Sequence, residues 1–143
     1  HNPDDLLRLT AELEAGADVA VGSRYSKGVT VVNWPMSRLL MSYCASRYVR
    51  IVTGMPVCDA TAGFVGYKRE VLAAIDFDRI EMVGYGFQIE MKYTAWKMGF
   101  RIGEVPIIFA DRTEGTSKMS GGIFGEAFFG VLALPFRTIA RKK

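Results

Sequence analysis

Three polar segments carry the side chains best suited to chemistry. Each places Arg or Lys close to Ser, Thr or Gly: residues 22–25 with Arg24, the pair Arg38 and Ser42, and residues 112–118 with Arg112 and Lys118. Guanidinium groups, hydroxyls and bare backbone amides all donate hydrogen bonds to phosphate or to another anion. Any one segment is more simply a solvated charged surface. Three of them in one small domain indicate a site for an anionic substrate.

Other common catalytic chemistries lack their residues in this sequence. The single His is residue 1, and Cys44 and Cys58 are not spaced as zinc ligands, so the chain itself predicts no metal site. It contains no P-loop, no Gly-x-Gly-x-x-Gly and no Gly-x-Ser-x-Gly motif. Nucleophilic catalysis by a Ser-His pair is unsupported, because no internal His is present.

Length and composition describe one globular domain, residues 1–143. Half of the residues are hydrophobic and 23% are charged, which excludes a disordered or collagen-like chain. A net charge of +3 is too small to indicate nucleic acid as a partner. Two cysteines favour reduced thiols in a cytosolic protein, and the polar, acidic start is unlike a secretory signal. The most apolar stretch, residues 123–136, is shorter than the ~20 residues of a spanning helix.

Helices and strands are expected to alternate, which is typical of the α/β class with a partly parallel sheet. Capping and breaker residues predict helices over residues 2–15, 35–53, 70–75, 85–98 and 123–140, and strands over 18–22, 64–67 and 101–109. Pro106 favours an edge strand or a bulge, and Pro135 a kink or break in the last helix. Residues 23–33 and 111–122 are expected to be loops. Because a helix comes first, we expect a fragment that follows an earlier strand.

The order of the motifs resembles one known family. The resemblance rests on the following motifs: Gly22-Ser23-Arg24-Tyr25, Trp34-Pro35 with Arg38 and Ser42, residues 59–64, residues 84–90, Glu104-Val105-Pro106-Ile107, and residues 112–118. Together they resemble the C-terminal half of the catalytic domain in polyprenol-phosphate (dolichol-phosphate) mannosyltransferases. These are inverting family-two glycosyltransferases with the GT-A fold, a Rossmann-like mixed sheet. Ala62 departs from the family, which more often has Ser there.

The resemblance implies a reaction and assigns roles to residues. Mannose would pass from GDP-mannose to a polyprenyl phosphate with inversion, and an ionised phosphate oxygen needs no strong base. Arg24, Arg38, Ser42 and Arg112 would hold the acceptor phosphate, and Lys118 would add charge. Asp59 and Gln88 would lie near the transferred sugar, supported by Glu90. The family's Asp-x-Asp motif, which binds Mg²⁺ or Mn²⁺, would precede His1, so we expect this chain alone to be inactive.

Simpler interpretations accompany several of these assignments. On periodicity alone Arg38 and Ser42 form a solvated helix face, and the resemblance reverses that preference. Asp59 could equally cap the turn before the next strand. Gln88 and Glu90 lie two residues apart on one helix, so they cannot share a face and one of them is expected to be structural.

The C-terminal segment, residues 121–143, is expected to form an amphipathic interface helix. Its apolar residues are followed by Arg137, Arg141, Lys142 and Lys143, a pattern typical of helices that lie on anionic membrane surfaces. Packing against a missing half of the domain is an equal alternative. A protein peripheral to the cytoplasmic face of a membrane is thus expected, and uncovered apolar faces favour self-association.

Two rival functions stay open at this stage. One is a related transferase that moves glucose or another sugar onto a prenyl phosphate. The other is a non-catalytic module that binds prenyl phosphate or a partner subunit.

Overall fold

A three-stranded mixed sheet lies at the centre of the computed structural model, which describes residues 3–110, 121–137 and 139–140. Strand β1 (Val19–Ser23) is central, with β3 (Val65–Tyr67) antiparallel on one side and β4 (Ile102–Pro106) parallel on the other. All five residues of β1 are buried, as its apolar sequence predicts. The expected α/β class with a partly parallel sheet is confirmed, and the mixed sheet is consistent with a fragment of a GT-A glycosyltransferase.

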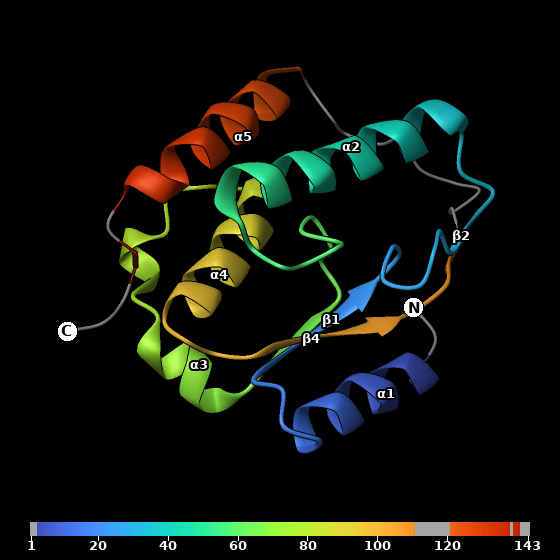
Figure 1. Ribbon diagram of the computed structural model, residues 1–143, viewed down its shortest axis with the longest axis horizontal. Coiled ribbons are helices and arrows are strands. Elements are labelled where there is room, and N and C mark those ends of the chain that lie inside the picture. The colour runs from blue at the N-terminus through green and yellow to red at the C-terminus, as the bar shows by residue number, and fades with distance from the viewer. Residues whose placement is uncertain (1–2, 111–120, 138, 141–143) are drawn as a thin grey trace.

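The two faces of the sheet are covered by different helices. Helix α1 (Pro3–Glu14) packs on one face through Leu9, which clusters with Ala20. Val19 and Val21 point to the other face and cluster with Met91 of α4 (Tyr85–Lys97). Alternate residues of a strand face opposite sides, so β1 serves both cores. Figure 1 shows α1 below the strands and α4 above them.

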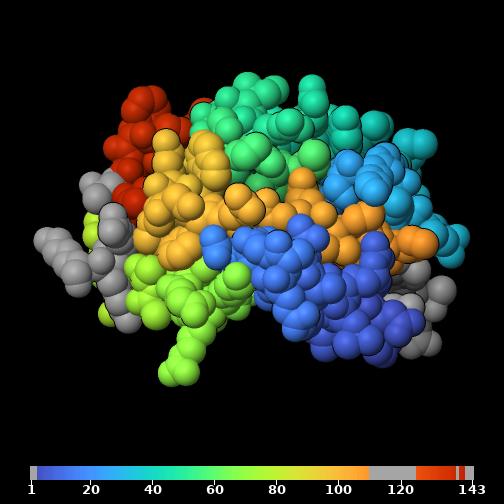
Figure 2. Space-filling model, turned by 60° about the horizontal axis from the view of Figure 1, so that its bottom comes forward, coloured from blue at the N-terminus to red at the C-terminus, as the bar shows by residue number. Residues whose placement is uncertain are grey.

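Helices α2 (Met36–Thr53) and α5 (Gly121–Ala133) form an outer layer over α4, and they lie side by side (Figure 1). Val49, Ile89, Tyr93 and Val131 are buried between these three helices. In the space-filling view, the segment of β4 forms a band between α1 and α2 (Figure 2). None of the helices in the described ranges is both long and apolar enough to cross a bilayer.

The middle part of helix α4 is buried on all sides. Residues 89–95 are all buried without a break. Two of them, Glu90 and Lys92, carry charges. Buried charges are tolerated only where hydrogen bonds and counter-charges replace water. The surroundings of α4 must therefore supply those partners.

Three expected boundaries differ from the structure. The loop expected over residues 23–33 contains a short strand, β2 (Val31–Val32), which pairs in parallel with β5 (Phe109–Ala110). The strand expected over 101–109 is therefore two strands, with Pro106 ending the first at the edge of the sheet. The last helix ends at Ala133, and a 3₁₀ turn (Leu134–Phe136) contains Pro135. Helix α3 (Arg69–Ala74) and a 3₁₀ turn (Phe77–Arg79) complete the elements between β3 and α4.

Candidate functional site

A buried ion pair between Arg24 and Asp59 forms the centre of the candidate site. Arg24 follows β1, and Asp59 lies in the turn after α2 and is fully buried. The guanidinium donates two hydrogen bonds of 2.7 Å to the two carboxylate oxygens, and the backbone N–H of Arg24 donates a third of 2.9 Å. Thr61 accepts a further bond of 3.0 Å from the same guanidinium. Burial lowers the pKa of Arg24, but the bond and charge of Asp59 outweigh it and raise the pKa overall.

The loop that carries Asp59 is held by Glu104 from β4. One carboxylate oxygen of Glu104 accepts hydrogen bonds from the backbone N–H groups of Cys58 and Asp59, at 3.0 and 3.1 Å. These bonds fix the backbone on which the Asp59 side chain stands. Asp59 thus does more than cap a turn, because its carboxylate bonds to a residue 35 positions away in the sequence.

Trp34 brings the two predicted phosphate-binding arginines together. The Cζ atom of Arg24 lies 5.1 Å from the centre of the Trp34 ring, and that of Arg38 lies 4.1 Å from it. Both distances are within the range of a cation–π interaction, about 6 Å. One indole ring, the Trp34 shelf, therefore positions a loop arginine and a helix arginine in one place.

Ser42 joins this group through Tyr25. The phenol of Tyr25 donates a hydrogen bond of 2.7 Å to the Ser42 hydroxyl, and Arg24 also lies 5.2 Å from the centre of the Tyr25 ring. Burial raises the pKa of Tyr25, so the phenol stays protonated at neutral pH and remains a donor. The structure therefore brings together Arg24, Arg38, Ser42 and Asp59, which the sequence placed in separate segments.

Gln88 and Glu90 lie on different sides of α4. A methyl group built on Gly63 would lie 3.9 Å from the Gln88 amide nitrogen, so Gln88 faces the loop of Asp59. Glu90 instead bonds to Arg137 at 2.8 Å and accepts bonds from the backbone N–H groups of Glu81 and Met82. These contacts give Glu90 the structural role expected for one member of the pair.

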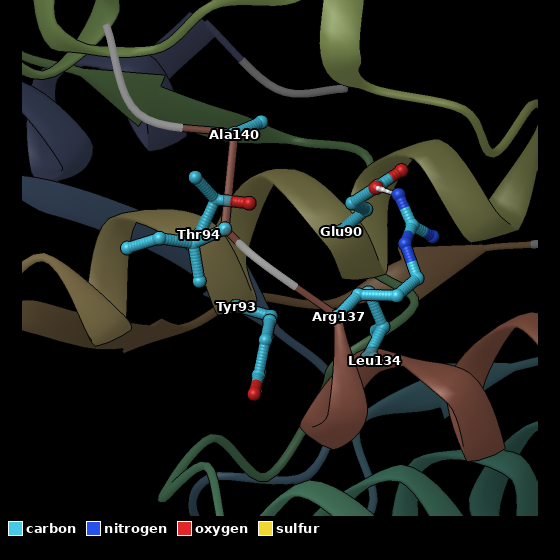
Figure 3. Close-up of a pocket in the computed structure, with 7 residues that line it drawn as sticks. Glu90, Tyr93, Thr94, Leu134, Arg137 and Ala140 are labelled. Carbon is cyan, nitrogen blue, oxygen red and sulfur yellow. Dashed lines mark hydrogen bonds and ion pairs between the residues drawn. The ribbon is translucent and has the colours of Figure 1, made fainter. Parts of the chain in front are cut away.

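Figure 3 shows Glu90 facing Arg137 beside a small hollow that Tyr93, Thr94 and Leu134 also line. The volume of this hollow is about 10 Å³, which suffices for about one water molecule and excludes a sugar or a phosphate. It is therefore a packing feature. Arg112 and Lys118 lie outside the described residues, so their predicted roles stay predictions.

The acidic side chains do not assemble a metal site in the described part of the chain. No three of its His, Cys, Asp and Glu residues lie together as ligands would. Asp59 and Glu104 are occupied by Arg24 and by backbone N–H groups. The residues described do not fit a divalent ion, and we derive no chemical step through one.

Comparison with known proteins finds similarity to three prenyl-phosphate mannosyltransferases. It is 47% identical over 131 residues to a polyprenol monophosphomannose synthase of Mycolicibacterium smegmatis, covering 92% of this chain and 49% of that protein. Identity is also 47% to an undecaprenyl-phosphate mannosyltransferase of Micrococcus luteus, of which 54% is covered. A dolichol-phosphate mannosyltransferase of Pyrococcus furiosus is 33% identical over 85% of this chain and 34% of its own length.

The chain is a homologue of the polyprenol-phosphate mannosyltransferases. The family resemblance drawn from its motifs is thereby confirmed. The chain spans about half the length of the first two of these mannosyltransferases. No protein-family model matches it.

Several residues of the site were not predicted as such. Trp34 and Glu104 appeared only as parts of motifs, and Tyr25 only as a neighbour of Arg24. Lys92 was not among the predicted site residues, although it is fully buried and donates to three backbone carbonyls. Its place between Met91 and Tyr93, two residues after Glu90, could have indicated it, since a charged residue on a buried helix must find a partner.

Proposed function

We propose that this chain forms the acceptor-phosphate side of a prenyl-phosphate mannosyltransferase. The observation that carries the proposal is the convergence of Arg24 and Arg38 on the Trp34 shelf. Two guanidinium groups held at one place can bond to a phosphate from two directions. The names of the homologues supply the rest, because each is a mannosyltransferase that acts on a prenyl phosphate.

The proposed chemistry needs positioning more than proton transfer. A phosphate oxygen of the acceptor is ionised near neutral pH, so it attacks the sugar without a strong base. Arg24, held by Asp59, would orient the phosphate, and the two guanidinium groups together would offset its charge. Gln88 and the Asp59 loop would face the transferred sugar, and Arg112 and Lys118 would close on the phosphate. In the whole protein the donor would be GDP-mannose. The acceptor phosphate oxygen would bond to the anomeric carbon with inversion as the bond to GDP breaks, GDP would leave, and Mg²⁺ or Mn²⁺ would be held outside this chain.

We also propose that the protein acts peripherally at the cytoplasmic face of a membrane. Support comes from the apolar side chains that α2 and α5 leave exposed: Met36, Leu40, Met41, Tyr43, Ile51, Phe128, Phe129 and Leu132. A stack of Tyr48 on Phe128, with ring centres 4.7 Å apart, joins the two helices into one surface, the α2–α5 surface. The lipid tail of the acceptor would lie against such a surface.

Binding of farnesyl phosphate to the chain tests the proposal. Calorimetry should detect binding of farnesyl phosphate. Inorganic phosphate and farnesol should each bind more weakly, because both the anion and the tail contribute to the affinity. Mannose transfer from GDP-mannose to the same acceptor by the whole protein then tests the reaction. Equal binding of farnesol and farnesyl phosphate would exclude an acceptor-phosphate site. Binding of the phosphate by a whole protein without transfer would favour the non-catalytic module.

A further inference from the structure

A buried ammonium group lies directly behind the Arg24–Asp59 pair. Lys92 is 0% exposed, and its Nζ donates hydrogen bonds to the carbonyls of Ala60, Ala62 and Gln88, at 3.0, 2.6 and 3.3 Å. An ammonium has three donors, and here three acceptors receive them. Two of these acceptors belong to the loop of Asp59, and the third belongs to the α4 turn that carries Gln88.

The same loop is therefore held from two sides by opposite charges. Glu104 accepts from its N–H groups at residues 58 and 59, and Lys92 donates to its carbonyls at residues 60 and 62. Asp59, whose carboxylate bonds to Arg24, lies in the loop between the residues that Glu104 and Lys92 hold. Movement of the loop in either direction would break bonds to a buried charge, which costs more than breaking bonds to a neutral group.

Stability alone does not account for a lysine at this position. A buried charge pays a large desolvation penalty, and apolar residues of similar size often serve a core as well or better. Burial lowers the pKa of Lys92 to about 7, while Asp59 and Glu104 oppose that shift. A penalty of this kind is consistent with a residue that specifies a geometry.

We propose that Lys92 is a positioning residue, which holds the Asp59 loop against α4 and so fixes the orientation of Arg24 toward an acceptor phosphate. The part that concerns the phosphate rests on the proposed function. The part that concerns Arg24 rests on the contacts of Lys92 alone. The two parts therefore call for separate readouts.

The experiment compares the 143-residue chain with its Lys92→Met variant, which keeps an unbranched side chain one atom shorter and removes the ammonium. NMR of the Arg24 Nε–H group reports its bond to Asp59, and calorimetry reports the affinity for farnesyl phosphate. We expect Lys92→Met to shift the Arg24 signal, to speed its exchange with water, and to weaken binding by about fivefold or more. Val71→Ala is the matched control, because Val71 is fully buried in α3. It should lower the melting temperature and leave both readouts unchanged.

The outcomes separate the two proposals. An unchanged Arg24 signal in Lys92→Met overturns the positioning role, and so does unchanged affinity where the parent chain binds. If the parent chain does not bind farnesyl phosphate, the proposed function fails, and the Arg24 signal alone decides the role of Lys92. Loss of both readouts in Val71→Ala as well would show that any destabilisation moves them, and would overturn the proposal.

A measurement on the parent chain covers the case in which Lys92→Met does not fold. The charged groups that act on Lys92 are Arg24 after β1, Asp59 after α2 and Glu104 on β4. Titration of Lys92, followed at its Cε, should move the Arg24 Nε signal with the same midpoint, because loss of the proton removes a donor from the loop. An Arg24 Nε signal that does not shift as Lys92 titrates overturns the proposal.

Discussion

Arg24 and Arg38 share the Trp34 shelf but differ in burial. The charge of Arg24 is matched at 2.7 Å by a carboxylate that is itself fully buried. Arg38 lies on the exposed-facing helix α2 and is only half-buried. The two guanidinium groups therefore reach the shelf from a buried loop and from a partly exposed helix.

Replacement of Arg38 should weaken the acceptor site without affecting the donor. Loss of one partner from a charge-assisted contact in a partly dry site costs about 2–4 kcal/mol. Arg38→Ala should therefore lower turnover of the whole protein by about tenfold or more at saturating GDP-mannose. Arg38→Lys should recover only part of the loss, since a point charge cannot reproduce a two-pronged contact. A titration of prenyl phosphate measures the effect.

Calorimetric binding of GDP-mannose is the control for Arg38. It should be nearly unchanged in Arg38→Ala. Normal turnover of Arg38→Ala would show that Arg38 is a solvated charge on the helix and does not hold the acceptor phosphate. A large loss of GDP-mannose binding would show that Arg38 belongs to the nucleotide-binding part of the site.

Trp34 should matter because it aligns both arginines. Trp34→Leu removes two cation–π contacts, each worth about 0.5–1 kcal/mol at a partly exposed position. Affinity for farnesyl phosphate should fall by roughly threefold to tenfold. Trp96→Leu is the matched control, because Trp96 contacts Lys97 and Tyr93 on α4, away from the shelf. Equal losses in the two variants would contradict a specific role for Trp34.

Lys92 should make the stability of the chain depend on pH. Its pKa is about 7 in the folded state and about 10.5 in the unfolded state, so between these values the unfolded chain binds the extra proton. The free energy of unfolding should therefore rise as the pH increases from about 7 to about 10, by at most about 1.4 kcal/mol per pH unit. Denaturant unfolding of the chain and of Lys92→Met measures the difference. A difference that is flat over this range would show that the folded-state pKa is not lowered.

At the scale of elements, the sequence predicted what is local. Gly54 ends α2 with a left-handed φ of 74°, as its place after an apolar helix suggests. The breaks at Pro106 and Pro135 also follow from single residues. Pairing of β2 with β5 could not be predicted, because two-residue strands have no periodicity and their partners lie 78 positions apart. The all-round burial of α4 has the same cause, since it depends on which elements cover it.

The candidate site also combines features that the sequence predicts with contacts that it could not predict. Arg24, Arg38, Ser42 and Asp59 could be named from their motifs, but the contacts that unite them run between distant segments. The ion pair of Arg24 joins residues 35 apart, and the bond of Lys92 to Ala60 joins residues 32 apart. Glu90 illustrates the opposite case, because its partner Arg137 lies 47 residues away in a segment that had been expected to be helical.

Gly22 lies next to the site, where β1 comes close to Ile107 and Phe64. A methyl group added there would lie 2.7 Å from Ile107, 2.9 Å from the Phe64 ring and 3.1 Å from the Phe64 carbonyl oxygen. Gly22→Ala should therefore destabilise the fold by about 1–3 kcal/mol. Gly125→Ala is the control, because nothing lies within 4 Å of the added methyl and alanine favours a helix. Unfolding in urea should rank Gly125→Ala above the parent chain and Gly22→Ala below it.

For the whole molecule, the α2–α5 surface is the feature that the fold itself leaves unexplained. Phe129 is 69% exposed and Ile51 is 76% exposed, in two helices that contact each other. We expect the chain to sediment with vesicles that contain anionic lipid, and Phe129→Glu to reduce the bound fraction severalfold. Leu72→Glu is a control on α3, outside this surface, and should bind like the parent. Self-association in place of vesicle binding, seen by light scattering, would contradict a membrane role for this surface.

Helix α4 carries its two buried charges two residues apart, at Glu90 and Lys92, and each has partners on a different side. A helix turns by about 100° per residue, so the two side chains leave the axis about 160° apart, in nearly opposite directions. The two charges therefore anchor α4 to its neighbours on two opposite sides. Rotation of α4 by one residue, or a slide by one turn, would withdraw both from their partners at once. A one-residue insertion between Glu90 and Lys92 would therefore turn one of the two charges away from its partners, whichever end of the helix stays in place.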